Sequence, residues 1–318
     1  MATEPITFRS PSNSDWSVSY VHLNQGAEHS LIFCYGAAGS ATLLQMFPAF
    51  LASHQNVSLL CINRWTQGKS VSRHGPSLFI ELSTITYELL DSLRIERFSI
   101  AAHSAGVYQM LHLAKTAAAG RIENLFPISA HIPAPFTGSK AMDYMCSMPN
   151  SLFKTVTTMD SMLAGTWVEK VFTRLVKLTN HGQDAENAFL VSRTSRERLL
   201  QQIRVNNKRV VEQVERLDLD YRLGYERIPG LDRDFLVGLF TECTTDMTWL
   251  AADNDVFFGP AIVPRIAKEM KEAKIEVVTI PEATHADIFI RTRVWEMIVA
   301  KIVGQDMSEP KNHQVEAI

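Results

Sequence analysis

The sequence predicts an α/β fold in which a mostly parallel sheet carries helices on both faces and receives an inserted helical cap. Strand-like and helix-like patterns alternate from residue 41 to residue 133, as expected when crossover helices join parallel strands. From 135 to 245 the strand patterns disappear and amphipathic helical stretches follow one another. Alternation returns after 245, so we expect one core, formed by residues 1–134 and 246–318, with the cap at 135–245.

The first part of the core begins with strands and then alternates. Residues 5–35 read as three strands, joined by turns at Ser10–Asn13 and Asn24–Gly26. The following elements are predicted in chain order: a helix near 41–53, a strand at 57–62, a helix near 77–93, a strand at 97–101, a helix at 107–115 and a strand at 125–129.

The cap and the second part of the core follow. Helical stretches of the cap are predicted near 150–164, 166–178, 184–216 and 231–242. Met247–Ala251 is a short apolar strand pattern, and Ile275–Ile280 alternates in polarity as a half-buried strand does. A helical pattern runs from about 287 to 303. The tail from Gln305 to Ile318 is polar, which predicts a flexible, disordered end.

One serine stands where a predicted strand meets a predicted helix. Ser104 follows the strand at 97–101, so its hydroxyl is expected on a sharp strand-to-helix turn. Such a turn requires small neighbours, because a large side chain would collide with the adjacent strand or helix. Ala102 and Gly106 meet this requirement, and the pentapeptide they bound is a relaxed form of Gly-x-Ser-x-Gly. The pattern predicts Ser104 as a nucleophile.

A serine hydroxyl needs a base, and the base needs an acid that holds its tautomer. In the chain order Ser, Asp, His, both partners follow strands late in the sequence. His285 follows the strand at 275–280 and is the predicted base. Asp253 and Asp255 both follow the strand at 247–251 and are candidate acids. Asp287 is a third candidate, although it falls in the first turn of the final predicted helix, where a carboxylate suits the helix dipole.

These motifs and their order resemble the α/β-hydrolase superfamily. In that family the loop after the last strand carries the catalytic histidine, and the acid after the penultimate strand closes a Gly-x-x-Asp stretch. With Ala252 in place of that glycine, the resemblance implies Asp255 as the acid and leaves Asp253 as its competitor. It also implies that the insertion is a lid, so that the active site is a cleft between core and cap.

The segment Tyr35–Ser40 resembles the family's His-Gly-x-x-Gly loop, with tyrosine in place of histidine. The resemblance implies that the backbone N–H groups of Ala37 and Ala105 form an oxyanion hole. Preorganised donors of this kind are typically worth about 10²- to 10³-fold in rate each. Backbone donors do not depend on side-chain identity. The replacement of histidine by tyrosine therefore affects what holds the loop in place and leaves the two N–H donors unchanged.

The segment Cys61–Ser70 resembles the family's Asp-Arg-x-Gly-x-Gly-x-Ser loop and departs from it at Asn63 and Thr66. The same segment contains Gly68-Lys69-Ser70, which also occurs in phosphate-binding loops. That motif requires a glycine five residues before Gly68, where Asn63 stands. The sequence therefore predicts no nucleotide site here.

Composition narrows the class of ligand. A net charge of −3 and a pI near 6.4 give no general affinity for nucleic acid or for an anionic membrane, so we expect a small-molecule substrate. The N-terminus lacks the pattern of a signal peptide and no apolar stretch reaches 18 residues, which predicts a cytoplasmic protein. No cysteine pair has metal-ligand spacing and no His-Glu-x-x-His motif occurs, so no metal and no cofactor are expected. The cysteines, expected as free thiols, are Cys34, Cys61, Cys146 and Cys243.

Three residues are candidates for the substrate pocket. Tyr35 and Trp65 lie on loops near the predicted oxyanion site, and His131 follows the strand at 125–129. Each has a purely structural role as its alternative. His103 is expected to point away from the base and to pack in the core. Five methionines between residues 142 and 162 either line an apolar pocket or pack the cap onto the core.

The resemblance implies an enzyme in which Ser104 attacks the acyl carbon of an ester, lactone, thioester or activated carbonyl of moderate size. Two alternatives remain open. The same site serves condensation, cyclisation or C–C bond chemistry in hydrolase-like enzymes of fungal secondary metabolism, which the chain resembles in its large cap. The fold also serves as a small-molecule receptor. The sequence leaves the oligomeric state and the substrate open.

Overall fold

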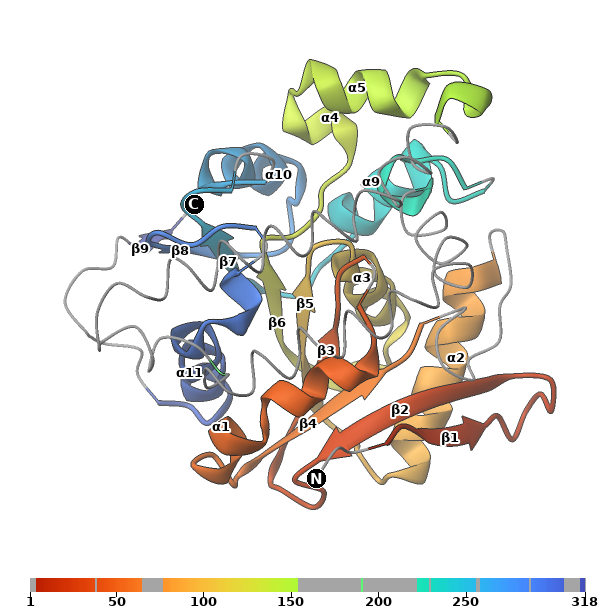
Figure 1. Cartoon of the computed structure of the whole chain (residues 1–318), viewed down its shortest axis with the longest axis vertical. Helices are drawn as coiled ribbons and strands as arrows, with labels where there is room; N and C mark the ends of the chain where they lie inside the picture. The colour runs from red at the N-terminus through yellow and green to blue at the C-terminus, as the bar shows by residue number, and fades with distance from the viewer. Residues whose placement is uncertain are drawn as a thin grey trace, which may run out of the picture.

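The structure is a computed structural model of the chain. It describes residues 4–37, 39–64, 77–153, 190, 222–228, 230–255, 258–285, 287–305 and 315–317. Within these residues the strands form one nine-stranded sheet in the order β1-β2-β4-β3-β5-β6-β7-β8-β9 (Figure 1). The described parts of the chain contain no helix with both the length and the apolar composition needed to cross a bilayer.

The sheet is parallel through its centre and antiparallel at both edges. From β4 through β3, β5, β6 and β7 to β8 all neighbours run parallel, whereas β1, β2 and β9 pair antiparallel with their neighbours. The strands are β1 Ile6–Arg9, β2 Ser17–Leu23, β3 His29–Cys34, β4 Val57–Ile62, β5 Phe98–His103, β6 Ile122–Ile128, β7 Met247–Ala252, β8 Ile275–Ile280 and β9 Val315–Ala317.

Helices cover both faces of the sheet, which confirms the predicted fold class. Residues of α2, α3, α9 and α10 pack in one apolar cluster, and residues of η1, α1 and α11 pack in another. The helices are η1 Ala41–Met46, α1 Pro48–Ala52, α2 Ser77–Ser92, α3 Gly106–Thr116, α4 Ala134–Thr137, α5 Lys140–Ser147, α9 Arg233–Thr241, η3 Pro260–Ile262, α10 Val263–Glu269, η4 Ile288–Ile290 and α11 Thr292–Ile302.

The alternation of side chains along the central strands explains the two clusters. In β3, Ile32 and Cys34 belong to the cluster under α2 and α3, whereas Leu31 and Phe33 belong to the cluster under α11. A strand buried on both faces reads as a continuous apolar run, and all six residues of β5 are buried. The carboxyl ends of these strands hold the loops that carry the candidate site.

The structure changes the prediction for two segments, and the helices α4, α5, η3 and α10 have no counterpart among the predicted elements. Residues 315–317 of the expected flexible tail form β9, because the outer edge of β8 offers backbone groups that the tail can pair with. Helix α9, expected within the cap, packs on the core: its Phe240 lies 6.4 Å from the ring of Trp249 on β7. The predicted helices at 166–178 and 184–216, and most of the one at 150–164, lie outside the described residues.

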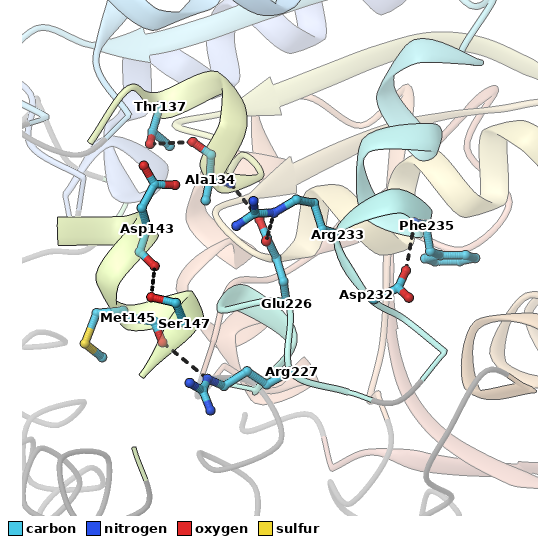
Figure 2. Close-up of polar contacts among 10 residues, drawn as sticks. All are labelled: Ala134, Thr137, Asp143, Met145, Ser147, Glu226, Arg227, Asp232, Arg233 and Phe235. Atoms are coloured by element: carbon cyan, nitrogen blue, oxygen red, sulfur yellow. Dashed lines mark hydrogen bonds and ion pairs between the residues drawn. The ribbon is translucent and has the colours of Figure 1, made fainter. Parts of the chain in front are cut away.

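The described end of the insertion is tied to the start of α4 by Glu226 (Figure 2). One carboxylate oxygen of Glu226 accepts the N–H of Ala134 at 2.7 Å, and the other accepts from Nε of Arg233 on α9 at 2.6 Å. Glu226 has a φ of 60°, so the chain turns sharply at this residue. The carboxylate therefore joins three segments, α4, the turn at 226 and α9.

The next residue, Arg227, ties the same turn to the end of α5 (Figure 2). Its guanidinium donates to three oxygens there, those of Met145, Met148 and Asn150. The guanidinium also lies over the ring of Phe153, 4.2 Å from its centroid. In Figure 1, α4 and α5 stand away from the sheet at the top of the view. Glu226 and Arg227 are thus the contacts that attach this arm to the described turn.

Candidate active site

Ser104 lies on a sharp turn between β5 and α3. Its φ of 50° is in the left-handed region, which residues with a β-carbon rarely adopt. Two glycines make room for the turn. A β-carbon on Gly106 would lie 2.2 Å from the carbonyl oxygen of Cys34, and one on Gly36 would lie 2.9 Å from the β-carbon of Ser104. The turn therefore depends on the small residues around Ser104.

Ser104, His285 and Asp255 form a continuous series of hydrogen bonds. Oγ of Ser104 lies 2.9 Å from Nε2 of His285, and Nδ1 of His285 lies 2.7 Å from Oδ2 of Asp255. The Asp255 side chain is fully buried, whereas 28% of the His285 side chain is exposed. A carboxylate beside Nδ1 favours the tautomer with its proton on Nδ1, which leaves Nε2 able to accept the serine proton. The arrangement can activate a hydroxyl.

The second oxygen of the Asp255 carboxylate is also satisfied. Oδ1 accepts the backbone N–H of Phe258 at 3.0 Å. Gly259 allows the loop to close on itself here, since a β-carbon at this position would lie 2.7 Å from the Asp255 carbonyl oxygen. The carboxylate is thereby held in one orientation, with one oxygen aimed at His285.

The other two candidate acids lie elsewhere. Asp253 is exposed beyond β7, and its backbone N–H donates to the carbonyl of Ile280. Asp287 accepts the N–H of Thr284 at 2.9 Å and pairs with Arg291 at 3.2 Å. Asp287 therefore stabilises the loop that carries His285. Of the three candidate acids, Asp255 is the one whose carboxylate is hydrogen-bonded to the His285 ring.

The two backbone donors assigned by resemblance flank Ser104. Ala105 is the N-cap of α3, where the preceding residues supply no intrahelical acceptor and the helix dipole favours negative charge. Ala37 is an exposed residue directly after Gly36, which packs on Ser104. A negative oxygen near Oγ could receive both N–H groups, and this role stays a prediction.

Tyr35 does not face a pocket; it supports the loop that carries Ala37. Only 1% of Tyr35 is exposed. Its hydroxyl accepts the backbone N–H of Arg64 at 2.7 Å, and the Arg64 guanidinium lies 4.7 Å from its ring centroid. A β-carbon on Gly39 would lie 2.6 Å from the ring. Tyr35 lies in the core, and not in a pocket as predicted, because it continues the alternation of β3 and packs with Phe33.

The end of β4 holds the same loop from the opposite side. Nη2 of Arg64 donates to the carbonyl of Gly36 at 2.8 Å. Oδ1 of Asn63 accepts the N–H of Ala41 at 2.7 Å, and its amide nitrogen donates to Ser19. The Asn63 side chain, where the resemblance has aspartate, thus accepts from the backbone of Ala41 and donates to the hydroxyl of Ser19, and a carboxylate could not make the second of these bonds as donor. Trp65, Thr66 and the Gly68-Lys69-Ser70 run lie outside the described residues.

His131 lies beside the series of hydrogen bonds, at the carboxyl end of β6. Its Nδ1 is 2.9 Å from the hydroxyl of Tyr108, and its ring lies 4.6 Å from that of Phe258. Burial, with a smaller contribution from the charge of His285, lowers the pKa of His131 to about 3. A neutral imidazole at this position could donate or accept a hydrogen bond. Its role as a pocket residue stays a prediction.

The sequence does not predict Phe258 or Tyr108 as site residues. Phe258 holds Asp255 through its N–H, and its ring lies 5.5 Å from that of His285. The signal in the sequence that points to it is the aromatic pair at 257–258, which begins two residues after Asp255. Tyr108 follows Ser104 by about one helical turn, and that spacing places it on the site side of α3.

His103 lies against His285, contrary to the expectation that it points away from the base. Its Nε2 is 2.9 Å from the backbone oxygen of His285, and the two rings are 5.2 Å apart. Phe289 covers the His103 ring at 4.6 Å. Burial, followed by the charge of His285, lowers the pKa of His103 to about 3. His103 is therefore a neutral imidazole in contact with the loop of the candidate base.

The thiols and methionines contribute little to the described site. Burial raises the pKa of Cys34 to about 12, so it is not a nucleophile at neutral pH. Met142 and Met148 are buried, and Met142 packs in the core cluster; Met159 and Met162 lie outside the described residues. Among the residues described, no three His, Cys, Asp or Glu side chains are grouped so that they could hold a metal ion.

Comparison with known proteins gives a consistent picture of the fold. No family model matches the sequence, and no curated protein matches it. MGS-M2, an α/β hydrolase enzyme from a Medee basin deep-sea metagenome library, aligns over 96% of this chain and 100% of its own with a TM-score of 0.61 and 15% identity. A thermophilic esterase from Thermogutta terrifontis aligns over 95% and 97%, with a TM-score of 0.60 and 13% identity. The esterase EaEST from Exiguobacterium antarcticum aligns over 96% and 98%, with a TM-score of 0.59 and 12% identity.

Proposed function

Because this chain has the α/β-hydrolase fold, we propose that it is a serine hydrolase in which Ser104 is the nucleophile. His285 acts as general base and then as general acid, and Asp255 orients it. The observation that carries the proposal is the series of hydrogen bonds from Ser104 through His285 to the buried carboxylate. Esterases and serine hydrolases among the structural neighbours support the class of reaction.

In the first half of the reaction, Oγ of Ser104 attacks the acyl carbon while its proton passes to Nε2 of His285. The carbonyl oxygen gains negative charge, which the N–H groups of Ala37 and Ala105 stabilise. The imidazolium is stabilised by the Asp255 carboxylate 2.7 Å from Nδ1. His285 then gives its proton to the leaving group, and the acyl-enzyme remains.

In the second half, a water molecule attacks the acyl carbon of the acyl-enzyme. His285 takes a proton from this water and returns it to Oγ of Ser104 as the acid is released. The exposed part of the His285 side chain is consistent with access by water and by a leaving group. No cofactor takes part in this scheme.

We assign the substrate to esters, lactones, thioesters or activated carbonyls carried by an apolar small molecule. Aromatic rings support this choice, because Phe258 and Phe289 surround the imidazoles next to Ser104. The Asp255 carboxylate is buried and paired, so it offers no free charge to a substrate. The cap is the natural source of further specificity.

Labelling by a fluorophosphonate tests the proposal. The wild-type protein is expected to form a stable adduct on the peptide that contains Ser104, detected by mass spectrometry, and to hydrolyse p-nitrophenyl esters. Ser104→Ala should lose both properties. Ser99→Ala is the matched control, since Ser99 is a buried serine on β5, the strand that leads to Ser104, and its loss should leave labelling intact. A folded wild-type protein that resists the probe would contradict the acyl-enzyme route.

The same variants separate the alternatives. Turnover of a natural substrate that survives Ser104→Ala and is lost with His285→Ala would favour proton-transfer chemistry, such as condensation or cyclisation. Ligand binding without product, unaffected by either substitution, would favour a receptor.

A further inference from the structure

We propose that His103 is a positioning residue that holds His285 in line with Ser104; this inference rests on the proposed function. Two hydrogen bonds support this inference. Two adjacent residues, 103 and 104, bind the same residue 285 at two points, one on its backbone and one on its ring. Because both attachments start from one short piece of chain, they fix the place and the orientation of the imidazole together.

The donor in the backbone attachment is defined by chemistry. A carbonyl oxygen can only accept, so Nε2 of His103 carries the proton and donates to the His285 carbonyl at 2.9 Å. The imidazole is neutral at neutral pH, which leaves Nδ1 without a proton. A neutral ring adds no positive charge beside His285 when that residue becomes protonated during the reaction.

His103 also touches the loop of the proposed oxyanion hole. A β-carbon on Gly36 would lie 3.0 Å from Nδ1 of His103, so the backbone of that loop packs directly on the imidazole. One side chain therefore contacts the turn of the nucleophile, the loop of the base and the loop that carries Ala37. The registration of these three segments determines the distances on which the proposed chemistry depends.

A second set of contacts supports the loop of His285. Arg291 donates to the carbonyl of Glu282 at 2.9 Å and pairs with Asp287, which in turn accepts the N–H of Thr284. These contacts fix the base of the loop. Whereas Ser104 and Asp255 bind the ring of His285, His103 binds its backbone carbonyl, so the loss of His103 should move the imidazole without unfolding the loop.

Two variants distinguish the effect of losing the N–H donor of His103 from the effect of losing its ring. His103→Gln places an amide N–H close to the former Nε2, whereas His103→Phe keeps a buried ring and removes the donor. His112→Phe is the matched control, because His112 is also a buried histidine, with Nδ1 2.7 Å from Oγ of Ser83 and its ring stacked on Phe79 at 5.5 Å. Its loss should cost stability without touching the site.

Two readouts test the proposal. The first is the low-field proton NMR signal of the His285 Nδ1–H that is bonded to Asp255. This signal is assigned by its absence in His285→Ala, and measuring it requires no turnover. The second is ester hydrolysis. In His103→Phe the signal should shift or broaden, and kcat should fall about 10- to 100-fold with KM nearly unchanged, since a displacement of about 1 Å costs on that order. His103→Gln should restore both readouts.

The outcomes are distinct. A folded His103→Phe protein whose signal and kcat match those of His112→Phe would overturn the inference. Absence of labelling and hydrolysis in the wild type would defeat the proposed function, while the NMR signal would still decide whether His103 sets the position of His285. An equal loss of kcat and an equal change of the NMR signal in His103→Gln and His103→Phe would also contradict the role of the His103 N–H as donor.

Discussion

Gly106 faces the backbone of Cys34 so closely that a β-carbon on Gly106 would lie 2.2 Å from the Cys34 carbonyl oxygen. The start of α3 and the end of β3 are thus packed backbone to backbone. This contact sets where the helix begins, and Ser104 lies on the turn directly before it. The position of the candidate nucleophile therefore depends on the absence of a side chain at residue 106.

Gly106→Ala should therefore destabilise the fold severely. Overpacking typically costs about 1–3 kcal/mol, and here the neighbour is a backbone carbonyl that cannot rotate away. Gly238→Ala is the control, because a β-carbon there meets only the flexible end of Glu242 at 3.3 Å within helix α9. That change should stabilise the protein by about 0.5–1 kcal/mol. Urea unfolding compares the two, and equal stabilities would contradict the packing described.

Asp255→Asn should reduce kcat for ester hydrolysis by about 10⁴-fold, as expected when an asparagine favours the wrong histidine tautomer. Asp253→Asn, two residues away on an exposed position, should leave kcat within about twofold. Steady-state kinetics on a p-nitrophenyl ester measures both. If Asp253→Asn proved the more damaging of the two, the assignment of the acid would be wrong.

Tyr35→Phe removes the hydroxyl that accepts the N–H of Arg64. The lost hydrogen bond should lower the free energy of unfolding by about 1–3 kcal/mol, because a buried donor is left without its acceptor. Since the same loop carries Ala37, kcat should fall as well. Tyr87→Phe loses a comparable bond to the carbonyl of Leu113, away from the site, and should lower stability alone. Thermal unfolding and kinetics together distinguish the two, and a similar kcat in both variants would contradict a role for the loop.

Acid should destabilise the protein through its buried histidines. Burial, with a smaller contribution from Lys115, lowers the pKa of His112 from 6.5 to about 4. Between these values the unfolded chain binds a proton that the folded chain does not, so the free energy of unfolding falls as pH falls from 6.5 to about 4. His103 and His131, each with a pKa of about 3, act in the same direction and extend the loss below pH 4.

His112→Asn isolates one of these contributions, because its amide can replace Nδ1 in the contact with Ser83. Across that pH range the variant should lose stability less steeply than the wild type, by up to about 1.4 kcal/mol per pH unit. Urea unfolding at several pH values measures the two slopes. Parallel slopes would mean that His112 does not titrate as described.

The sequence predicts the fold, the nucleophile Ser104 and the base His285 from local patterns, and the same patterns leave the acid among a few aspartates. Apolar runs and helical spacing place the strands, and Ser104, Asp255 and His285 each lie in the connection that follows one. Choosing between Asp253 and Asp255 required the resemblance, because both follow β7 within three residues. Their separation comes from the turn after β7, which buries the second carboxylate and exposes the first.

Other features depend on contacts between distant segments. The alternation of β3 could have placed Tyr35 in the core with Leu31 and Phe33, but its partner Arg64 lies on another loop. His103 binds a carbonyl 182 residues away, which no local pattern reveals. β9 likewise exists only because the edge of β8 is available to it.

One contact of the insertion has a mechanical consequence. Leu190, which lies in the sequence between β6 and β7, is buried and donates its N–H to the carbonyl of Ile290 at 2.9 Å. Ile290 closes the short helix that follows His285. A displacement of residue 190 would therefore act on the backbone of Ile290, five residues beyond His285, through this one hydrogen bond, and Leu190 and the loop of the candidate base are mechanically linked.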